Sequence, residues 1–91
     1  MDNQIIITVS GLDNVGIVAR ITKELADMNI NIEDIKQTLM QGHFVMFMLC
    51  NIENSKVPFK DIKSSFASIA NELGMEIWVQ KREIFDNMHR I

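Results

Sequence analysis

The sequence predicts a small α+β domain in which four strands and two helices follow one another in the order β-α-β-β-α-β. Two stretches repeat apolar residues at helical spacing, and four others have the alternation or the apolar content of strands. With 91 residues the chain can build one hydrophobic core, so we treat 1–91 as a single domain with its core over 4–82. The order is that of the split βαβ, ferredoxin-like sandwich. Right-handed crossovers give an antiparallel sheet of order 4-1-3-2 with both helices on one face.

The first strand is expected over residues 4–10 and the first helix over 14–28. In the strand, Ile5, Ile7 and Val9 lie on one side, as expected when one face is buried. In the helix, apolar residues recur at i, i+3, i+7 and i+10, and charged residues fill the opposite side. The apolar set is Val18, Ile21, Leu25 and Met28. This pattern predicts an amphipathic helix with one core face.

Polar residues mark both ends of this helix. Asp13 or Asn14 can cap its first amide groups, and Asn29 can adopt the left-handed conformation that ends a helix.

The second and third strands are expected over 30–41 and 43–52, joined by a tight turn at Gln41-Gly42. Alternation slips between Ile32 and Ile35, which predicts a bulge. The third strand is apolar on both faces and is therefore expected in the centre of the sheet.

Ser55 and Pro58 open the second helix and Gly74 closes it. Its apolar residues have helical spacing, and they are Phe59, Ile62, Phe66, Ile69 and Leu73. Residues 75–82 alternate again and form the fourth strand. The tail, 83–91, places apolar residues on one side of a short helix, and these are Ile84, Phe85, Met88 and Ile91.

Composition excludes several classes of function. A net charge of -3 without a Lys/Arg cluster argues against nucleic-acid binding. The single Cys50 forms no intrachain disulfide, and His43 and His89 are isolated, so no metal site or metal cofactor is predicted. The start has no basic signal region, and no apolar run approaches the roughly 20 residues that span a bilayer. We expect a cytoplasmic protein without membrane contact.

No constellation of catalytic residues is present, so we predict a protein that is not an enzyme. Cys50 lies in an apolar strand without a neighbouring base. Acylphosphatase shares this fold and has an Arg near the position of Arg20. Its phosphate cradle is Gly-rich, however, and Asp13 would put a negative charge inside such a cradle.

The loop before the first helix resembles a motif of the ACT domain family. Its residues Leu12-Asp13-Asn14-Val15-Gly16-Ile17-Val18, followed by Ala19-Arg20-Ile21, are similar to Asp-x-Pro-Gly-hydrophobic-hydrophobic-Ala-x-Ile/Val. Asn29-Ile30-Asn31-Ile32 resembles the family's exit into its second strand. The resemblance covers about residues 4 to 82 and extends to single-domain ACT proteins of unassigned function and to the amino-terminal ACT part of the glycine cleavage system transcriptional repressor. Val15 stands where the family usually has Pro, which loosens the loop without redirecting it.

The residues also suggest a ligand site by themselves. A helix N-terminus presents unpaired amide groups that suit a carboxylate, and Gly16 allows close approach. Asp13 and the loop carbonyls can take an ammonium group, so an amino acid fits the turn. The alternative is that Asp13 or Asn14 only caps the helix and Gly16 only permits tight packing.

The resemblance implies a regulatory module that binds a small molecule, an amino acid in many members, between two subunits. The ligand would contact the loop Asp13, Asn14, Val15, Gly16, Ile17 and Val18 of one subunit and Asn31 and Ile32 of the other.

The face of the sheet without helices would show Ile6, one side of the third strand and Trp78, covered by the tail or by a second subunit. We therefore expect a homodimer or larger homo-oligomer. A constitutive oligomerisation or docking module without ligand is the alternative.

Overall fold

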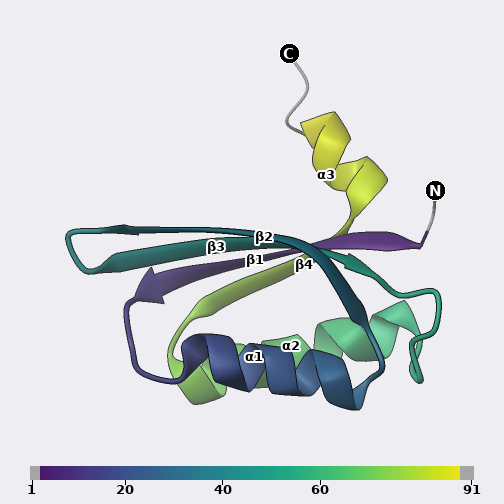
Figure 1. The fold of residues 1–91 in the computed structure, drawn as a ribbon, viewed down its shortest axis with the longest axis horizontal. Helices are drawn as coiled ribbons and strands as arrows, with labels where there is room; N and C mark the ends of the chain where they lie inside the picture. The colour runs from purple at the N-terminus through teal and green to yellow at the C-terminus, as the bar shows by residue number, and fades with distance from the viewer. Residues whose placement is uncertain (1–2, 89–91) are drawn as a thin grey trace.

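The computed structural model describes residues 3–88, which form one four-stranded antiparallel sheet and three helices (Figure 1). The strands are β1 (Gln4–Leu12), β2 (Asn31–Met40), β3 (His43–Asn51) and β4 (Glu76–Lys81). The helices are α1 (Ile17–Asp27), α2 (Phe59–Leu73) and α3 (Arg82–Met88). The sheet order is β2-β3-β1-β4, which is the predicted 4-1-3-2 order read from the opposite edge. The predicted ferredoxin-like plan is confirmed.

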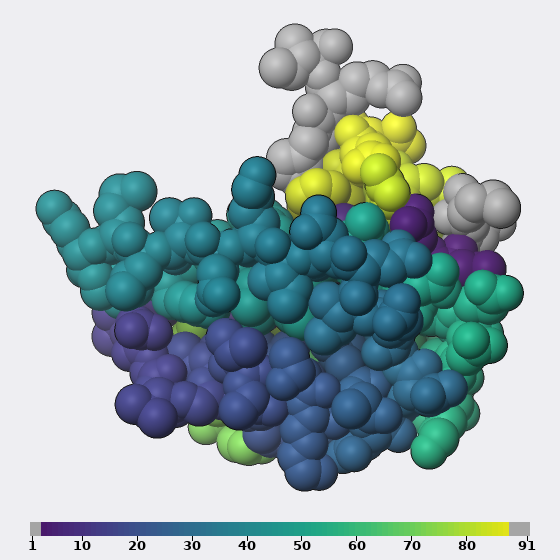
Figure 2. All heavy atoms as spheres, in the orientation of Figure 1, coloured from purple at the N-terminus to yellow at the C-terminus, as the bar shows by residue number. Residues whose placement is uncertain are grey.

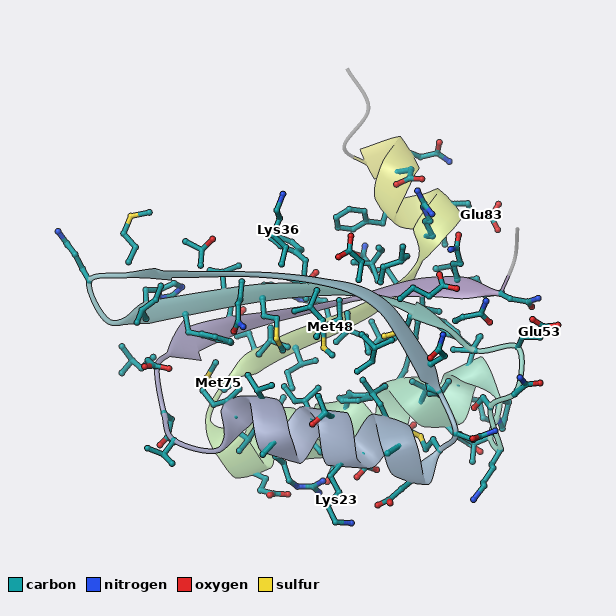
Figure 3. All side chains as sticks on the ribbon, viewed as in Figure 1. Lys23, Lys36, Met48, Glu53, Met75 and Glu83 are labelled. Carbon is teal, nitrogen blue, oxygen red and sulfur yellow. The ribbon has the colours of Figure 1, made fainter. Side chains whose placement is uncertain are left out.

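Helices α1 and α2 lie on one face of the sheet, and α3 stands on the other (Figure 1). The core fills the space between the sheet and the first two helices. In Figure 3, Met48 of β3 points toward these helices, and Lys36 of β2 points away from them. The side chains without measurable exposure are Ile5, Ile7, Val9, Ile21, Leu25, Met46, Met48, Cys50, Ile62 and Phe66. The sheet therefore has one buried face and one face that is largely open.

The predicted turns are confirmed by backbone geometry. Asn29 ends the first helical segment with a φ of 61°, and Gly74 ends α2 with a φ of 67°. The register of β2 on β3 shifts between Ile32 and Asp34, which is the predicted bulge. Met40 pairs with His43, so the connection has two residues, Gln41 and Gly42, both with positive φ. Positive φ at both central residues is typical of a type I′ hairpin turn.

Some element boundaries differ from the prediction. Strand β1 extends two residues further, to Leu12, because Gly11 and Leu12 still pair with Phe44 and His43. Helix α3 begins at Arg82, before the predicted tail. The predicted contributions of Met88 and Ile91 to its apolar side lie outside the side chains that the structure describes.

The open face of the sheet carries the predicted apolar residues. Trp78 is 50% exposed and Phe47 is 40% exposed. Helix α3 covers part of this face, and the ring of Phe85 meets the ring of Phe47 edge-to-face at a centroid distance of 6.3 Å. Figure 2 shows α3 rising above one end of the sheet, while the β2–β3 hairpin projects at the other end. Within residues 3–88, no helix is long and apolar enough to cross a bilayer.

Candidate functional site

The turn between β1 and α1 is the first half of the candidate site. The helix begins at Ile17, and Gly16 occupies the N-cap position with a φ of 89° and no side-chain cap. The prediction that Asp13 or Asn14 caps the helix is therefore wrong. The amide of Asp13 donates to the carbonyl oxygen of Gly42 at 2.9 Å, which holds Asp13 against the β2–β3 turn, three residues before the N-cap. Val15 likewise lies before the helix, not in its first turn.

At this turn, the first amide groups of α1 have neither a side-chain cap nor an acceptor within the helix. The first helical hydrogen bond runs from the amide of Arg20 to the carbonyl of Gly16, so the three preceding amides have no intrahelical acceptor. No acidic residue lies in the first turn of α1. The residues from Asp13 to Gly16 are exposed, Val18 is half-buried and Ile17 is buried in the core. The arrangement can accept a small anion such as a carboxylate.

Gly16 is required by its backbone conformation and not by packing. A Cβ added there would meet no atom within 4 Å, so the alternative in which Gly16 permits tight helix-sheet packing is wrong. Its φ of 89° is one that residues with a Cβ rarely adopt. The space in front of Gly16 is open to a ligand or to a second subunit.

Gly11, by contrast, lies close to the side chain of Met75. A Cβ at this position would lie 2.6 Å from the sulfur of Met75, the residue that follows Gly74. Met75 is labelled in Figure 3, where it lies between the sheet and the helices. A side chain at position 11 would therefore require the end of the Met75 side chain to move.

Asn31 and Ile32 form the second half of the candidate site, at the start of β2. Asn31 is exposed and lines a polar hollow of about 520 Å³ together with Asn29 and Asn51. Asn29 donates to the carbonyl oxygen of Asn54, and Asn51 donates to Glu33. The side chain of Asn31 makes no hydrogen bond within the described part of the chain, so it is available to a ligand.

A single chain does not bring the two halves together. The turn lies beside Gly42, near the end of β2, whereas Asn31 begins the same strand. Ten residues of extended strand span roughly 30 Å. Figure 1 shows the same separation, with the two halves at opposite ends of α1.

Comparison with known proteins decides the family. The ACT domain family matches residues 3–80. The chain is 43% identical to a UPF0237 protein of Listeria monocytogenes over 86 residues, which cover 94% of this chain and 97% of that protein. It is 45% identical to a UPF0237 protein of Methanocaldococcus jannaschii over 89 residues, which cover 98% of this chain and 99% of that protein. The chain belongs to the ACT domain family.

Solved structures agree with this assignment. An ACT domain protein from Streptococcus pneumoniae superposes with a TM-score of 0.78 at 32% identity, covering 91% of this chain and 93% of that one. A formyltetrahydrofolate deformylase from Pseudomonas syringae has the same fold, with a TM-score of 0.79 at 23% identity. In that match, 85% of this ACT domain aligns with 26% of the deformylase. ACT domains are in general regulatory modules that respond to small molecules.

Arg20 of this ACT domain has a structural role. Its guanidinium donates to both oxygens of Glu72 on α2, at 2.9 and 3.2 Å, and to Glu24 at 2.9 Å. Glu24 also accepts a hydrogen bond from Ser65 of α2, and this bond, followed by that from Arg20, lowers the pKa of the Glu24 carboxyl. The guanidinium pKa is raised, chiefly by the hydrogen bond to Glu72. Arg20 thus joins α1 to α2 and is not free to hold a phosphate.

The Cys50 thiol and the Ser10–His43 pair are two further polar groups of this ACT domain. Burial raises the pKa of the Cys50 thiol to about 12, so the thiol stays protonated at neutral pH. The hydroxyl of Ser10 lies 3.0 Å from Nε2 of the exposed His43, a pair that sequence analysis missed because it forms diagonally across β1 and β3. Within residues 3–88, no three acidic, His or Cys side chains gather closely enough to hold a metal ion.

Proposed function

We propose that this ACT domain is a regulatory module that binds an amino acid between two copies of the chain. The N-terminus of α1 at Gly16 carries the proposal, because its first amides have no acceptor within the helix, no side chain caps them and no acidic residue lies in the first turn. They suit the carboxylate of an amino acid. Asp13 and the carbonyl groups of the turn suit the ammonium group.

The edge of β2 supports the placement of the site between subunits. This strand lies at one edge of the sheet, and its residues are exposed except for the half-buried Ile32. Ile35, Leu39 and Met40 are 39%, 59% and 67% exposed, which is a large apolar content for a free edge. Antiparallel pairing of two β2 strands about a two-fold axis would bring Asn31 of one copy near Met40 of the other. The turn held by Gly42 would then face Asn31 and Ile32 of the partner subunit.

A thermal-shift screen of the twenty amino acids at millimolar concentration tests this function. We expect one or a few amino acids to raise the melting temperature, because a ligand bound to the folded state stabilises it by mass action. Asp13→Ala and Asn31→Ala should each reduce that shift, since they remove the ammonium partner and the free amide. Lys60→Ala, an exposed change on α2, is the matched control and should keep it.

A constitutive oligomerisation or docking module without ligand is the second candidate. The apolar residues of β2 favour it, since they can hold two subunits together without any ligand. The lack of a polar side chain at Gly11, beside the turn, also favours it. A dimer that no amino acid stabilises would support this alternative and contradict the sensory function.

A further inference from the structure

Strand β4 lies at the second edge of the sheet, opposite to β2 (Figure 1). Within residues 3–88, no further strand lies beside its outer edge. A hollow of about 510 Å³ lies at this strand. It is separate from the amino-acid site proposed above, and a dimer formed through β2 would leave it free.

The hollow is lined from both faces of the sheet. Trp78 pairs with Thr8 and Thr8 pairs with Phe47, so these three side chains lie in one row on the open face. Phe85 of α3 lies over the same face, against Phe47. Lys63 and Ala67 line the hollow from α2, which covers the opposite face. The hollow therefore wraps around the edge of β4.

The extension of the hollow around the edge of β4 favours an extended peptide over a small molecule as its occupant. A small molecule lying on one face of the sheet would fill only half of a hollow that extends around the edge. An added strand presents alternate side chains to the two faces and places its backbone groups opposite those of β4. An extended peptide is thus the occupant that matches both the shape of the hollow and the position of β4 at the edge of the sheet.

The two faces of the hollow differ in chemistry. The open face offers the half-exposed ring of Trp78 beside Phe47 and Phe85, which suits apolar side chains. On the helix face, Lys63 lines the hollow, and its ammonium group lies 5.7 Å from the centre of the Phe59 ring. Lys81, at the end of β4 and outside this lining, has its ammonium group 5.5 Å from the same ring. Neither lysine has a carboxylate within 4.0 Å among the described residues, so this face suits acidic side chains.

We propose that the β4 edge binds an extended segment of a partner protein in which apolar residues alternate with acidic ones. The segment adds to the sheet as a fifth strand, with its apolar side chains on Trp78 and its acidic side chains on Lys63. A second copy of the chain fits less well at this edge. Helix α2 packs along β4, so a two-fold axis at the edge would bring Lys63 of each copy toward the other, and like charges repel.

A labelled peptide tests the proposal with the whole chain. The probe is fluorescein-labelled Glu-Val-Glu-Val-Glu-Val, blocked at both ends, with binding measured by fluorescence anisotropy. The contact is mapped by amide chemical shifts in ¹⁵N-labelled protein. We expect saturable binding with shifts concentrated in residues 76–81. The isomeric peptide Glu-Glu-Glu-Val-Val-Val should bind far more weakly, because it cannot place one kind of side chain on each face.

Reversing the charge at position 63 allows the binding of acidic and basic peptides to be compared. Lys63→Glu should weaken binding of the acidic peptide roughly five- to tenfold and should strengthen binding of Lys-Val-Lys-Val-Lys-Val by a similar factor. Lys60→Glu, an exposed residue of the same helix that does not line the hollow, is the matched control and should change binding little. Both variants keep the fold because both side chains are exposed.

Four results would overturn the proposal. Equal binding of the alternating and grouped peptides would show that no strand is added. Amide shifts confined to β2 would move the contact to the other edge. Absence of saturable binding up to millimolar peptide would remove the site altogether. Loss of self-association on Trp78→Arg would also overturn it, since that result assigns the β4 edge to a second copy.

Discussion

Cys50 shows how burial alone changes the chemistry of a side chain in this ACT domain. It lies on the helix-facing side of β3 with no exposed surface, and its thiol pKa rises from about 9.0 to about 12. Desolvation is the main cause, and Glu33 adds to it. A thiol in this state is a poor nucleophile and a small apolar group in the core. The residue therefore belongs to the packing of the domain.

The raised pKa of Cys50 predicts a loss of stability at alkaline pH. Between about pH 9 and pH 12, the unfolded thiol loses its proton while the folded thiol keeps it, so the unfolded state is favoured as the pH rises. We expect the free energy of unfolding in urea to fall more steeply above pH 9 in the native chain than in Cys50→Ala. Parallel slopes in the two proteins would contradict the prediction. A thiol reagent at pH 8 should modify Cys50 only after unfolding.

At the turn before α1, the sequence predicted the turn itself but not which residue caps the helix. The signals for a helix start and a glycine turn are local, so the position of the turn was predictable, and the ligand site there stays a prediction. The capping role of Asp13 was not, because Asp13 is held by Gly42, which lies 29 residues further along the chain. Similarly, the contact of Gly11 with Met75 joins two elements that the sequence separates. Contacts between residues far apart in the chain produce no pattern among neighbouring residues, so the sequence does not predict them.

At the scale of elements, α1 and α2 are joined by a polar network on their shared surface. Glu24 accepts from Ser65 and from Arg20, and Arg20 also binds Glu72. The α-helical pattern predicted both helices but not this network, because their relative placement depends on packing against the sheet. The network fixes one helix against the other beneath the sheet.

The lowered pKa of Glu24 predicts a contribution to stability that acid removes. Its charged form is favoured in the folded state, so the contribution is present above the ordinary carboxyl pKa near 4.5 and is lost as the pH falls through the lower folded value. Glu24→Gln should cost on the order of 1 kcal/mol at neutral pH. Its unfolding free energy should also vary less below pH 4.5, as measured in urea. Asp61→Asn, an exposed carboxylate in the first turn of α2, is the control.

The β2–β3 turn predicts a stabilising substitution. Gln41 and Gly42 have φ values of 50° and 82°, and Gln is poorly suited to the first of these positions. Gln41→Asn should therefore raise the free energy of unfolding by about 0.5 kcal/mol, because Asn adopts the left-handed conformation more readily. Gly42→Ala should lower it by about 1 kcal/mol. Urea denaturation measures both, and destabilisation by Gln41→Asn would contradict the assignment of the turn.

At the scale of the whole molecule, the sheet has two free edges that differ in character. Strand β2 has ten residues, with exposed Ile35, Leu39 and Met40. Strand β4 has six residues and lies beside aromatic rings and lysines. A regulatory module that acts on another protein needs one surface for assembly and another for its partner. We assign β2 to the first role and β4 to the second.

This assignment predicts a dimer that depends on β2. Size-exclusion chromatography with light scattering at low micromolar concentration should give about twice the 10.5 kDa mass of one chain. Leu39→Lys should shift the mass toward the monomer, because it places a charge in the apolar contact, whereas Lys63→Glu beside β4 should leave the dimer intact. An amino acid that binds across the interface should raise the dimer fraction of Leu39→Lys, since occupancy and assembly are thermodynamically linked. A native mass near 10.5 kDa would contradict the prediction and with it the shared site.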